Sequence, residues 1–344
     1  METALVTGGS GFVAGHLVDL LLREGWQVRT TVRSLANAQK NRALTDLAVR
    51  YPGKLELHQA DLLREGSFDA AMNGCGVVFH VASPFLMPEQ IKDGMKQVVE
   101  PALKGTRNVL DTVNRSPGVR RVVLTSTVGA IFGDYIDVRQ MKDGILSEAY
   151  FNSTSTAENN PYHYSKVMAE KEAWDICGRQ SRWTMVAINP GLILGPALTG
   201  ASDSGSLFLL DEMLKGAFFY GAADFSFTTV DVRDVALAHL RAAQREQTKG
   251  RYILAEKTMS SFLDMARLLR PVHRRAWLLP RWTVPDAGVR LIGPAFGLTQ
   301  DYIRNHLGIR FTVDNQRSID ELGIAYRPLA ETLKDHYEAW REAR

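Results

Sequence analysis

The stretch TALVTGGSGFVAGHLVDLLL, residues 3–22, decides the fold that we expect. Small and apolar residues fill its start, a glycine-rich turn follows, and leucines then recur at the spacing of an amphipathic helix. A second apolar strand is expected from Val28 to Val32. Such a unit binds a pyrophosphate, because the bare amide groups and the positive dipole end at the helix N-terminus attract an anion.

The glycines are spaced Gly8-x-x-Gly11-x-x-Ala14, which differs from the commonest dinucleotide-binding pattern, G-x-G-x-x-G. An ordinary tight turn between a strand and a helix is the alternative explanation. The position directly after a strand and before a helix favours the dinucleotide site. Ala14 adds only a methyl group where a glycine would permit close packing of helix and strand.

The end of the second strand decides which dinucleotide is expected. NAD sites place a carboxylate there for the ribose 2′-hydroxyl, whereas NADP sites offer cations to the 2′-phosphate. Here the strand ends in Arg33, no carboxylate adjoins it, and Lys40 follows seven residues later. A guanidinium presents a planar, permanently charged fork of donors that suits a phosphate. The sequence therefore favours NADPH/NADP+, with a solvated surface arginine as the alternative for Arg33.

Strands and helices alternate through the first two thirds of the chain. Further strands are expected at 54–58, 77–84, 121–124 and 184–188. Six strands with interposed helices predict an α/β fold with a Rossmann doubly wound parallel sheet. Beyond Gly195 short helices and strands mix, which predicts a smaller C-terminal α+β lobe. We expect an NADP-binding Rossmann domain at 1–195, with parts of 225–255, and a mainly substrate-binding lobe at 196–344.

Two helices and a polar segment are expected within this pattern. One helix covers 89–114 and is interrupted by Pro101, and another covers 165–178. Residues 133–160 lose periodicity and are polar, which predicts an excursion over the rim of the active site.

Two polar positions near strand ends allow more than one interpretation. Asp61 and Leu62 follow the third strand, where they would lie beside the adenine or, in the alternative, cap a helix. His80 lies inside a continuous apolar strand with no nucleophile near it in sequence. We interpret it as a hydrogen-bonded core histidine rather than a catalytic one.

A threonine hydroxyl and a tyrosine–lysine pair form the candidate catalytic set. Thr127 follows a strand, and Tyr162 and Lys166 are four apart, so they share one face of a helix. Tyrosine has an ordinary pKa of about 10, and a nearby ammonium favours its ionised form. Tyr162 would then protonate a carbonyl oxygen while Thr127 holds that oxygen in place. The pair alone is frequent by chance, but combined with the glycine turn it predicts hydride chemistry.

The residues carry a resemblance to a known family. The chain resembles an extended short-chain dehydrogenase/reductase, and more narrowly the group of dihydroflavonol 4-reductase, cinnamoyl-CoA reductase and yeast-type aldehyde/methylglyoxal reductase. The matching stretches lie in the first 240 residues: 6–17, 31–34, 79–84, 123–127, 162–166 with 169–170, 189–191 and 230–236.

The resemblance implies that Thr127, Tyr162 and Lys166 form the catalytic triad, with Lys166 also binding the nicotinamide ribose. The group usually has serine where this chain has Thr127, which keeps the hydroxyl and adds a methyl. Ser126 is the alternative, but consecutive strand residues face opposite sides, so only one can face the substrate. The implied cofactor contacts come from Gly8, Ser10, Gly11, Phe12, Val13, Arg33, Lys40, Asp61, Leu62, Val81, Ala82, Ser83, Thr125, Tyr162, Lys166, Pro190, Gly191, Leu192 and Ile193.

Large apolar side chains offer a substrate pocket. The candidates are Phe85, Phe132, Phe208 and Phe225, with Leu192 and Phe227 in similar segments. Each taken alone fits a core position as well. As a set they predict a pocket for apolar or aromatic aldehydes and ketones, and hence an NADPH-dependent carbonyl reductase. The alternatives are a nucleotide-sugar epimerase or dehydratase of the same superfamily and a non-catalytic NADP-binding protein.

Composition limits the compartment and partners. The chain has 344 residues and a net charge of +3, too small to predict a nucleic-acid partner. Its basic cluster is interpreted as a solvated face, with phosphate binding as the alternative: Arg267, Arg270, Arg274, Arg275 and Arg281. No apolar run approaches a membrane span, and Cys75 and Cys177 lack metal-like partners. We expect a cytoplasmic monomer or homodimer with a small-molecule substrate, no metal and no membrane partner.

Overall fold

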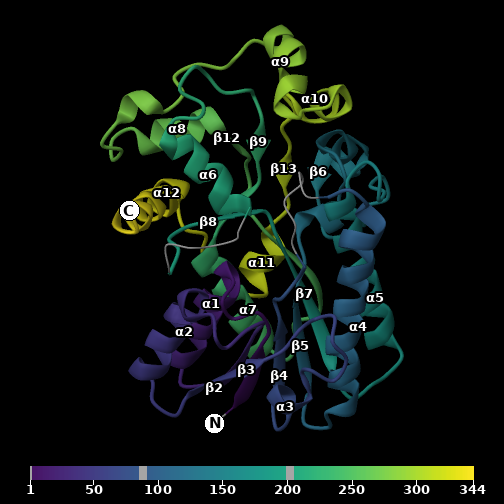
Figure 1. Ribbon diagram of the computed structural model, residues 1–344. Helices are drawn as coiled ribbons and strands as arrows, with labels where there is room; N and C mark the ends of the chain where they lie inside the picture. Colours follow the sequence, from purple (N-terminus) through teal and green to yellow (C-terminus); the bar gives the residue numbers. More distant parts are fainter. Residues whose placement is uncertain (1, 85–90, 199–204) are drawn as a thin grey trace.

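A seven-stranded parallel sheet forms the centre of the computed structural model, which describes residues 2–84, 91–198 and 205–344 (Figure 1). Its strand order is β11-β7-β5-β4-β1-β2-β3, and every neighbouring pair is parallel. The strands are β1 (Thr3–Val6), β2 (Gln27–Val32), β3 (Leu55–Gln59), β4 (Val77–His80), β5 (Arg121–Thr125), β7 (Thr184–Pro190) and β11 (Gly250–Leu254). The predicted doubly wound sheet is therefore confirmed, with the order reversing between β1 and β4.

Helices cover both faces of this sheet (Figure 1). One face carries α1 (Phe12–Arg23), α2 (Ala38–Arg50) and α7 (Val232–Gln244), and the other carries α3 (Asp69–Met72), α4 (Glu100–Arg115) and α5 (Pro161–Gly178). Successive residues of β1 alternate between the two cores, since Ala4 and Val6 pack with the first set and Leu5 with the second. Both faces are buried, which explains why the strands are continuously apolar.

The sheet has one strand more than the six predicted. β11 lies beyond Gly195 in the chain, yet it pairs with β7 and extends the sheet at that edge. Its residues Tyr252, Ile253 and Leu254 are completely buried, so apolar burial on both faces draws this strand into the large sheet.

Pro101 does not interrupt the long helix, contrary to the sequence prediction. A π-helical turn, η2 (Met95–Val99), runs directly into α4, and Pro101 lies in the first turn of α4. Proline is tolerated there because a first-turn residue needs no intrahelical N–H donor. The helical segment begins at Gly94, and the predicted start at 89 lies outside the described residues.

The helix with the tyrosine–lysine pair begins earlier than predicted. α5 starts at Pro161 rather than Ser165, because the Asn160 side chain accepts a hydrogen bond from the His163 backbone N–H at 3.1 Å. Proline at the first helical position has the required φ already. Tyr162 therefore lies in the first turn, and Lys166 one turn later.

Two further groups of elements lie beyond the carboxyl ends of the strands (Figure 1). The polar segment 133–160 contains two short helical turns and a short strand, in keeping with its lack of periodicity: η4 (Tyr135–Gln140), η5 (Lys142–Gly144) and β6 (Ile145–Leu146). The turn η3 (Val128–Ala130) precedes it. The C-terminal lobe contains β8 (Leu192–Leu194), α6 (Gly205–Lys215), β9 (Ser226–Phe227), β10 (Thr229–Asp231), β12 (Ser260–Ser261), α8 (Phe262–Leu269), η6 (Ala276–Leu278), α9 (Asp286–Ile292), η7 (Gly293–Phe296), α10 (Gln300–His306), β13 (Thr312–Val313), α11 (Gln316–Asp320) and α12 (Leu329–Glu342).

The C-terminal lobe has a hydrophobic core of its own, drawn from β8, α6, α8, α10 and α12. This agrees with the predicted smaller α+β lobe. Among the described residues, no helix combines the length and apolar character needed to cross a membrane.

Candidate active site

The glycine turn brings the backbone of β1 close to the end of β4. Gly8 has a φ of +73°, a conformation that favours glycine, and a Cβ there would approach the Ala82 Cβ to 3.0 Å. A Cβ on Gly9 would collide with the Thr30 hydroxyl. The turn is closed by the Gly11 N–H, which donates to the Gly8 carbonyl at 2.8 Å. These close approaches explain the glycines at positions 8 and 9 without any ligand.

The N-terminus of α1 has no side-chain cap. Gly11 occupies the N-cap position, and the first turn contains no acidic residue. The first N–H groups of a helix have no intrahelical acceptor, so this end can accept an anion. The predicted contacts Ser10, Phe12 and Val13 surround this end, as a pyrophosphate site requires.

Thr7 connects the ends of β1 and β4. Its hydroxyl oxygen accepts hydrogen bonds from the backbone N–H groups of Val81 at 3.0 Å and Ala82 at 2.9 Å. It also lies 3.1 Å from His80 Nδ1. His80 is buried, and burial lowers its pKa to about 4. The structure therefore confirms His80 as a neutral, hydrogen-bonded core histidine, and fixes the predicted residues Val81 and Ala82 beside the glycine turn.

Two cations lie at the β2 edge of the sheet. Arg33 directly follows β2 and is exposed, and its side chain has no hydrogen bond or ion pair with the described residues. Lys40 is also exposed, in the first turn of α2, where its backbone N–H donates to the Asn37 side chain at 3.1 Å. The Arg33 side chain therefore makes no polar contact that would stabilise the fold among the described residues.

Asp61 forms a local turn rather than a helix cap. Its carboxylate accepts the Leu63 N–H at 2.8 Å, and α3 begins only at Asp69. The following turn is fixed by Asn108 of α4, which donates to the Leu62 carbonyl at 3.0 Å and to the Arg64 carbonyl at 2.7 Å. Sequence reasoning missed Asn108, because a single amide in an amphipathic helix carries no distinguishing pattern.

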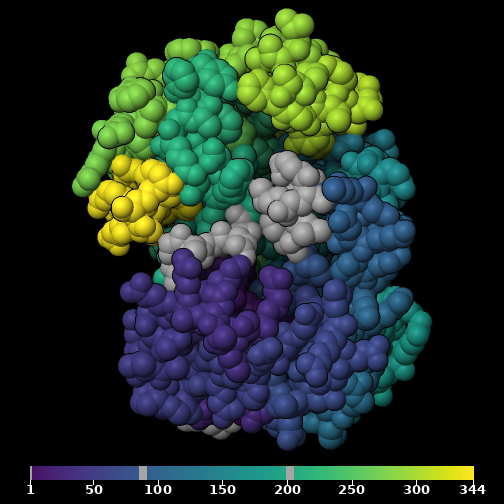
Figure 2. Space-filling model, viewed as in Figure 1, coloured from purple at the N-terminus to yellow at the C-terminus, as the bar shows by residue number. Residues whose placement is uncertain are grey.

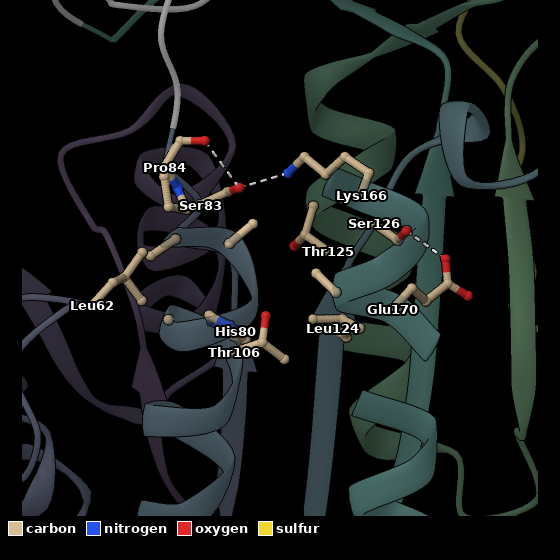
Figure 3. Close-up of a pocket in the computed structure, with 14 residues that line it drawn as sticks. Leu62, His80, Ser83, Pro84, Thr106, Leu124, Thr125, Ser126, Lys166 and Glu170 are labelled. Carbon is tan, nitrogen blue, oxygen red and sulfur yellow. Dashed lines mark hydrogen bonds between the residues drawn. The ribbon is translucent and has the colours of Figure 1, made fainter. Parts of the chain in front are cut away.

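Tyr162 and Lys166 share one face of α5, as their spacing predicts. The Lys166 ammonium lies 5.6 Å from the centre of the Tyr162 ring and donates a hydrogen bond to the Ser83 hydroxyl at 2.7 Å (Figure 3). Burial lowers the pKa of Lys166 to about 8. The Tyr162 side chain is 36% exposed, yet the protein atoms packed around its phenol raise its pKa to about 12 by desolvation.

Ser126 and Thr127 make different contacts at the end of β5. Ser126 is buried and donates to Glu170 at 2.5 Å, so its hydroxyl is already bound within the core. The Thr127 hydroxyl oxygen accepts the Gly129 N–H at 3.2 Å and lies 3.4 Å from the Pro190 carbonyl. Long contacts of this kind are easily exchanged for a substrate oxygen, which supports Thr127 over Ser126.

The segments that carry Thr127 and Tyr162 are in direct contact. A Cβ on Gly129 would collide with the ring of His163, so the turn after β5 packs tightly against the first turn of α5. The His163 Nδ1 lies 3.1 Å from the Gly133 carbonyl, and burial lowers the pKa of this histidine to about 4. A neutral His163 thus fixes the start of α5 against the rim segment.

A buried carboxylate lies one turn beyond Lys166 on the same helix. Glu170 is 1% exposed and accepts hydrogen bonds from Ser126, from Asn189 at 2.9 Å and from Trp174 at 3.2 Å. Asn189 also donates to the Thr127 carbonyl at 3.0 Å. Glu170 therefore connects α5 with the ends of β5 and β7.

Arg251 of β11 balances this buried charge. Its Nε donates to Glu170 at 2.6 Å, and its remaining N–H groups reach the carbonyls of Glu148, Tyr150 and Ala130 in the rim segment. The sequence patterns described above assign no role to Glu170 or Arg251. In the sequence, Glu170 could be recognised by its spacing of four residues from Lys166. Arg251 could be recognised as a lone charged residue beside the buried end of a strand.

Five of the predicted cofactor residues line one narrow cavity between β4 and β5 (Figure 3). They are Leu62, Ala82, Ser83, Thr125 and Lys166. The other residues around it are His80, Pro84, Ala102, Gly105, Thr106, Leu124, Ser126, Ala169 and Glu170. The Thr125 hydroxyl lies 2.7 Å from His239 Nε2, which ties it to α7.

The predicted residues after β7 lead into the C-terminal lobe. Pro190 ends β7, and a Cβ on Gly191 would collide with the Thr228 carbonyl. That carbonyl accepts the Leu192 N–H at 2.6 Å, and β8, which includes Ile193, then pairs with β10. The chain therefore passes from the large sheet into the C-terminal lobe at residues 190–193, which are predicted to contact the cofactor.

The aromatic candidates for the substrate pocket lie in different surroundings. Phe132 is 3% exposed and packs against His163 and Phe311, and Phe225 is 7% exposed in the core of the C-terminal lobe. Phe227 packs against Phe262, and Leu192 is half-buried beside the same core. Phe208 on α6 is 52% exposed, and Phe85 lies outside the described residues. Of these, Phe208 has the most surface available to a ligand.

No group of three metal-ligating side chains occurs in the part of the chain that the structure describes. Apart from His163 and the Glu170 carboxylate, which is paired with Arg251, the polar groups described near β5 and α5 include hydroxyls, a phenol and an ammonium, which suit proton transfer and hydrogen bonding to an oxygen.

Comparisons with known proteins agree with this geometry. A model of the NAD dependent epimerase/dehydratase family matches residues 4–255, which run from β1 to the end of β11. The chain is 32% identical to cinnamoyl-CoA reductase CAD2 of Medicago truncatula, over 98% of this chain and 95% of that protein. It is 32% identical to dihydroflavonol 4-reductase of Arabidopsis thaliana, over 83% and 72%. The solved structure of Gre2 from Candida albicans in complex with NADPH superposes with a TM-score of 0.79, at 28% identity over 100% of this chain and 99% of that one.

The residues that carry the resemblance, the strand order and these relatives all lead to one assignment. The chain belongs to the NAD dependent epimerase/dehydratase family, as an extended short-chain dehydrogenase/reductase similar to the cinnamoyl-CoA and dihydroflavonol reductases.

Proposed function

We propose that this protein is an NADPH-dependent carbonyl reductase that reduces an aldehyde or ketone and oxidises the corresponding alcohol in reverse. The observation that carries the proposal is the pair on α5, with the Lys166 ammonium 5.6 Å from the Tyr162 ring. The similarity to reductases and to an NADPH complex supports it. We also propose that residues 1–195, with parts of 225–255, bind the cofactor and that 196–344 mainly bind the substrate.

Three features of this chain fit an NADP cofactor. The glycine turn leaves no room for a Cβ at Gly8, the N-terminus of α1 is uncapped, and Arg33 is exposed without a protein partner among the described residues. The first two suit a pyrophosphate, and the third suits the 2′-phosphate that distinguishes NADP from NAD. When bound, NADPH supplies the hydride.

The chain's own residues then handle the carbonyl oxygen. The Thr127 hydroxyl donates a hydrogen bond to that oxygen, and the Tyr162 phenol transfers its proton to it as negative charge develops. The Lys166 ammonium stabilises the tyrosinate that remains. In alcohol oxidation the same groups act in the opposite direction, with tyrosinate accepting the hydroxyl proton. Desolvation by burial raises the pKa of Tyr162 to about 12, which keeps the phenol protonated for reduction.

The test is a cofactor and substrate panel. Purified protein is mixed with NADPH or NADH and with aldehydes, diketones, ketoesters and flavanonols, and cofactor absorbance is followed. We expect turnover with NADPH on apolar or aromatic carbonyls. Absence of turnover with the whole panel, together with a thermal shift by UDP-glucose, would instead favour nucleotide-sugar chemistry. NADPH binding without any turnover would favour a binding protein.

A further inference from the structure

One segment of the C-terminal lobe has a larger net positive charge than the complete chain. Residues 267–296 contain six arginines, no lysine, no glutamate and a single aspartate, Asp286, for a net charge of +5. The complete chain carries +3, so the remaining residues carry a net −2. This segment includes the basic cluster that the sequence analysis left without a function.

Four of these arginines are exposed and unpaired. They are Arg274, Arg275, Arg281 and Arg290, whose side chains have no hydrogen bond, ion pair or ring contact with any described residue. The other two are used by the fold: Arg267 lies 3.3 Å from Asp264, and Arg270 donates to the Pro280 carbonyl at 2.5 Å. The charges of these four side chains are therefore not neutralised by the described protein residues and stay available to an anionic partner.

Large apolar side chains stand among these arginines. Leu291 is 81% exposed, Phe296 69%, Trp277 61% and Trp282 55%. Leu268 and Ile292 of the same segment are also exposed, as are Phe219 and Tyr220 in the loop after α6. Single exposed leucines are common on soluble proteins, but a cluster that includes two tryptophans marks an interaction site.

These side chains belong to one region of the lobe. The Ala222 N–H donates to the Trp282 carbonyl at 3.1 Å, and the Val284 N–H donates to the Ala222 carbonyl at 2.9 Å. The loop with Phe219 and Tyr220 therefore lies beside the segment with Trp282, which continues into α9. Figure 1 places α9 at the end of the molecule remote from the N-terminus, and Figure 2 shows the C-terminal lobe forming that whole end.

We propose that this aromatic–basic surface, made of the four unpaired arginines with Trp277, Trp282, Leu291 and Phe296, binds the surface of an anionic membrane. Tryptophan and aliphatic side chains enter the interfacial layer of a bilayer, while arginines pair with lipid phosphates. Peripheral binding of this kind needs no spanning helix. The sequence expectation of no membrane partner rests only on the lack of an apolar span.

Charge argues against the other occupants. A second copy of this chain would bring the same arginines face to face across a two-fold contact, which like charges oppose. Nucleic acid would suit the arginines and tryptophans, but it offers no apolar phase for Leu291 and Phe296. An anionic bilayer satisfies both the charge and the apolar side chains.

Vesicle sedimentation tests the proposal with the full-length protein. The probes are vesicles of phosphatidylcholine alone and of phosphatidylcholine with about 30% phosphatidylserine. We expect binding to the anionic vesicles only, weakened by added salt because surface charges are screened. Vesicle binding should weaken about tenfold or more in the double variant Arg274→Glu/Arg275→Glu, since each arginine near an anionic surface contributes about 1 kcal/mol. A loss of about tenfold or more is also expected in the double variant Trp277→Ser/Trp282→Ser, which removes apolar side chains that would enter the interfacial layer.

The matched control is Arg42→Glu/Arg50→Glu, an equal charge change at exposed positions of α2. This variant should bind nearly as well as the wild type, and thermal unfolding checks that every variant folds. The proposal is overturned if no vesicle binds, if neutral vesicles bind equally, or if the control loses as much as the patch variants. Self-association that the patch variants abolish would also overturn it, in favour of a second copy. Reductase turnover on a water-soluble carbonyl is independent of all these outcomes.

Discussion

The two regions on either side of the glycine turn are built in opposite ways. Around α5, the Glu170 carboxylate is buried and held by hydrogen bonds from Ser126, Asn189 and Arg251. At the end of β2, Arg33 is exposed and lacks a protein partner among the described residues. The first region fixes geometry before any ligand arrives, whereas the second keeps a charge available for one.

This difference follows from what each region is proposed to do. Proton transfer requires that the donor lie within hydrogen-bond reach of the substrate oxygen, so the helix with Tyr162 must be held in place. Recognition of a phosphate requires a cation whose charge is not already neutralised. Substitutions around α5 should therefore impair turnover or folding, and substitutions at the end of β2 should impair cofactor binding.

The largest effect is expected from Tyr162→Phe, which removes only the phenolic hydroxyl. Loss of a positioned general acid costs about 10²- to 10⁴-fold, so kcat should fall by about that factor. The Kd for NADPH, measured by fluorescence titration, should stay nearly unchanged. Tyr164→Phe, two residues along the same helix, is the matched control and should keep its turnover. Equal activity of the two variants would remove Tyr162 from the mechanism.

The next effect concerns the buried network. Glu170→Gln keeps the size of the side chain but leaves the buried Arg251 uncompensated, which should lower the free energy of unfolding by about 3–5 kcal/mol. Denaturant titration measures this loss. Glu172→Gln on the same helix is the control, because its partner Arg107 is largely exposed and such surface pairs contribute at most about 1 kcal/mol.

The same variant also tests whether the network positions the catalytic groups. If Glu170 holds α5 against β5, Glu170→Gln should lower kcat even at temperatures well below its unfolding midpoint, where the variant is folded. The Kd for NADPH should stay within about twofold of the wild-type value. A variant that is less stable yet fully active at low temperature would show that the network serves stability alone.

The exposed region is tested by Arg33→Ala. A charge-assisted hydrogen bond contributes about 1.5–3 kcal/mol, so the Kd for NADPH should rise about 10- to 100-fold while the Kd for NADH changes little. Arg50→Ala, at an exposed position at the end of α2, is the control and should change neither. Equal losses for both cofactors would contradict recognition of the 2′-phosphate by Arg33.

The two regions also differ in how much the sequence reveals. The glycine turn, Arg33 and the Tyr162–Lys166 spacing are local signals, since each is read within one βαβ unit or one helical turn. The Glu170 network could not be predicted in this way. Its members come from β5, α5, β7 and β11, and only the sheet order brings them together.

The errors in the predicted elements have the same origin. The seventh strand falls in 225–255, parts of which are expected in the Rossmann domain, but about sixty residues separate it from β7, so no local pattern predicts that the two strands pair. Pro101 is read as a helix break because proline lacks an N–H, but its place in the first turn of α4 removes that requirement. Phe132 and Phe225 look like pocket residues in sequence and are buried in cores, because sequence cannot separate the two environments.

A smaller effect is expected from pH. Burial lowers the pKa of Lys166 to about 8 and raises that of Tyr162 to about 12, so the phenol stays protonated while the ammonium is lost as the pH rises through 8. The rate of carbonyl reduction should therefore fall by up to about tenfold per pH unit above that point. Lys166→Arg keeps the charge and should move the decline to higher pH. If Lys166→Arg has the same pH–rate profile as the wild type, Lys166 is not the group whose titration lowers the rate.

The smallest effect is expected from Thr127→Ser, which restores the residue usual in the group that this chain resembles. The hydroxyl remains and only a methyl is lost, so kcat should change by no more than about threefold, the value of a small rotamer-entropy difference. Thr127→Val keeps the shape and removes the hydroxyl, and should lower kcat by about 10²-fold if that group donates to the substrate oxygen. Ser126→Ala is the remaining comparison, because Ser126 donates to Glu170 rather than facing the substrate. A larger loss of kcat in Ser126→Ala than in Thr127→Val, at equal stability, would transfer the role to Ser126 and place the reacting oxygen on the buried side of β5.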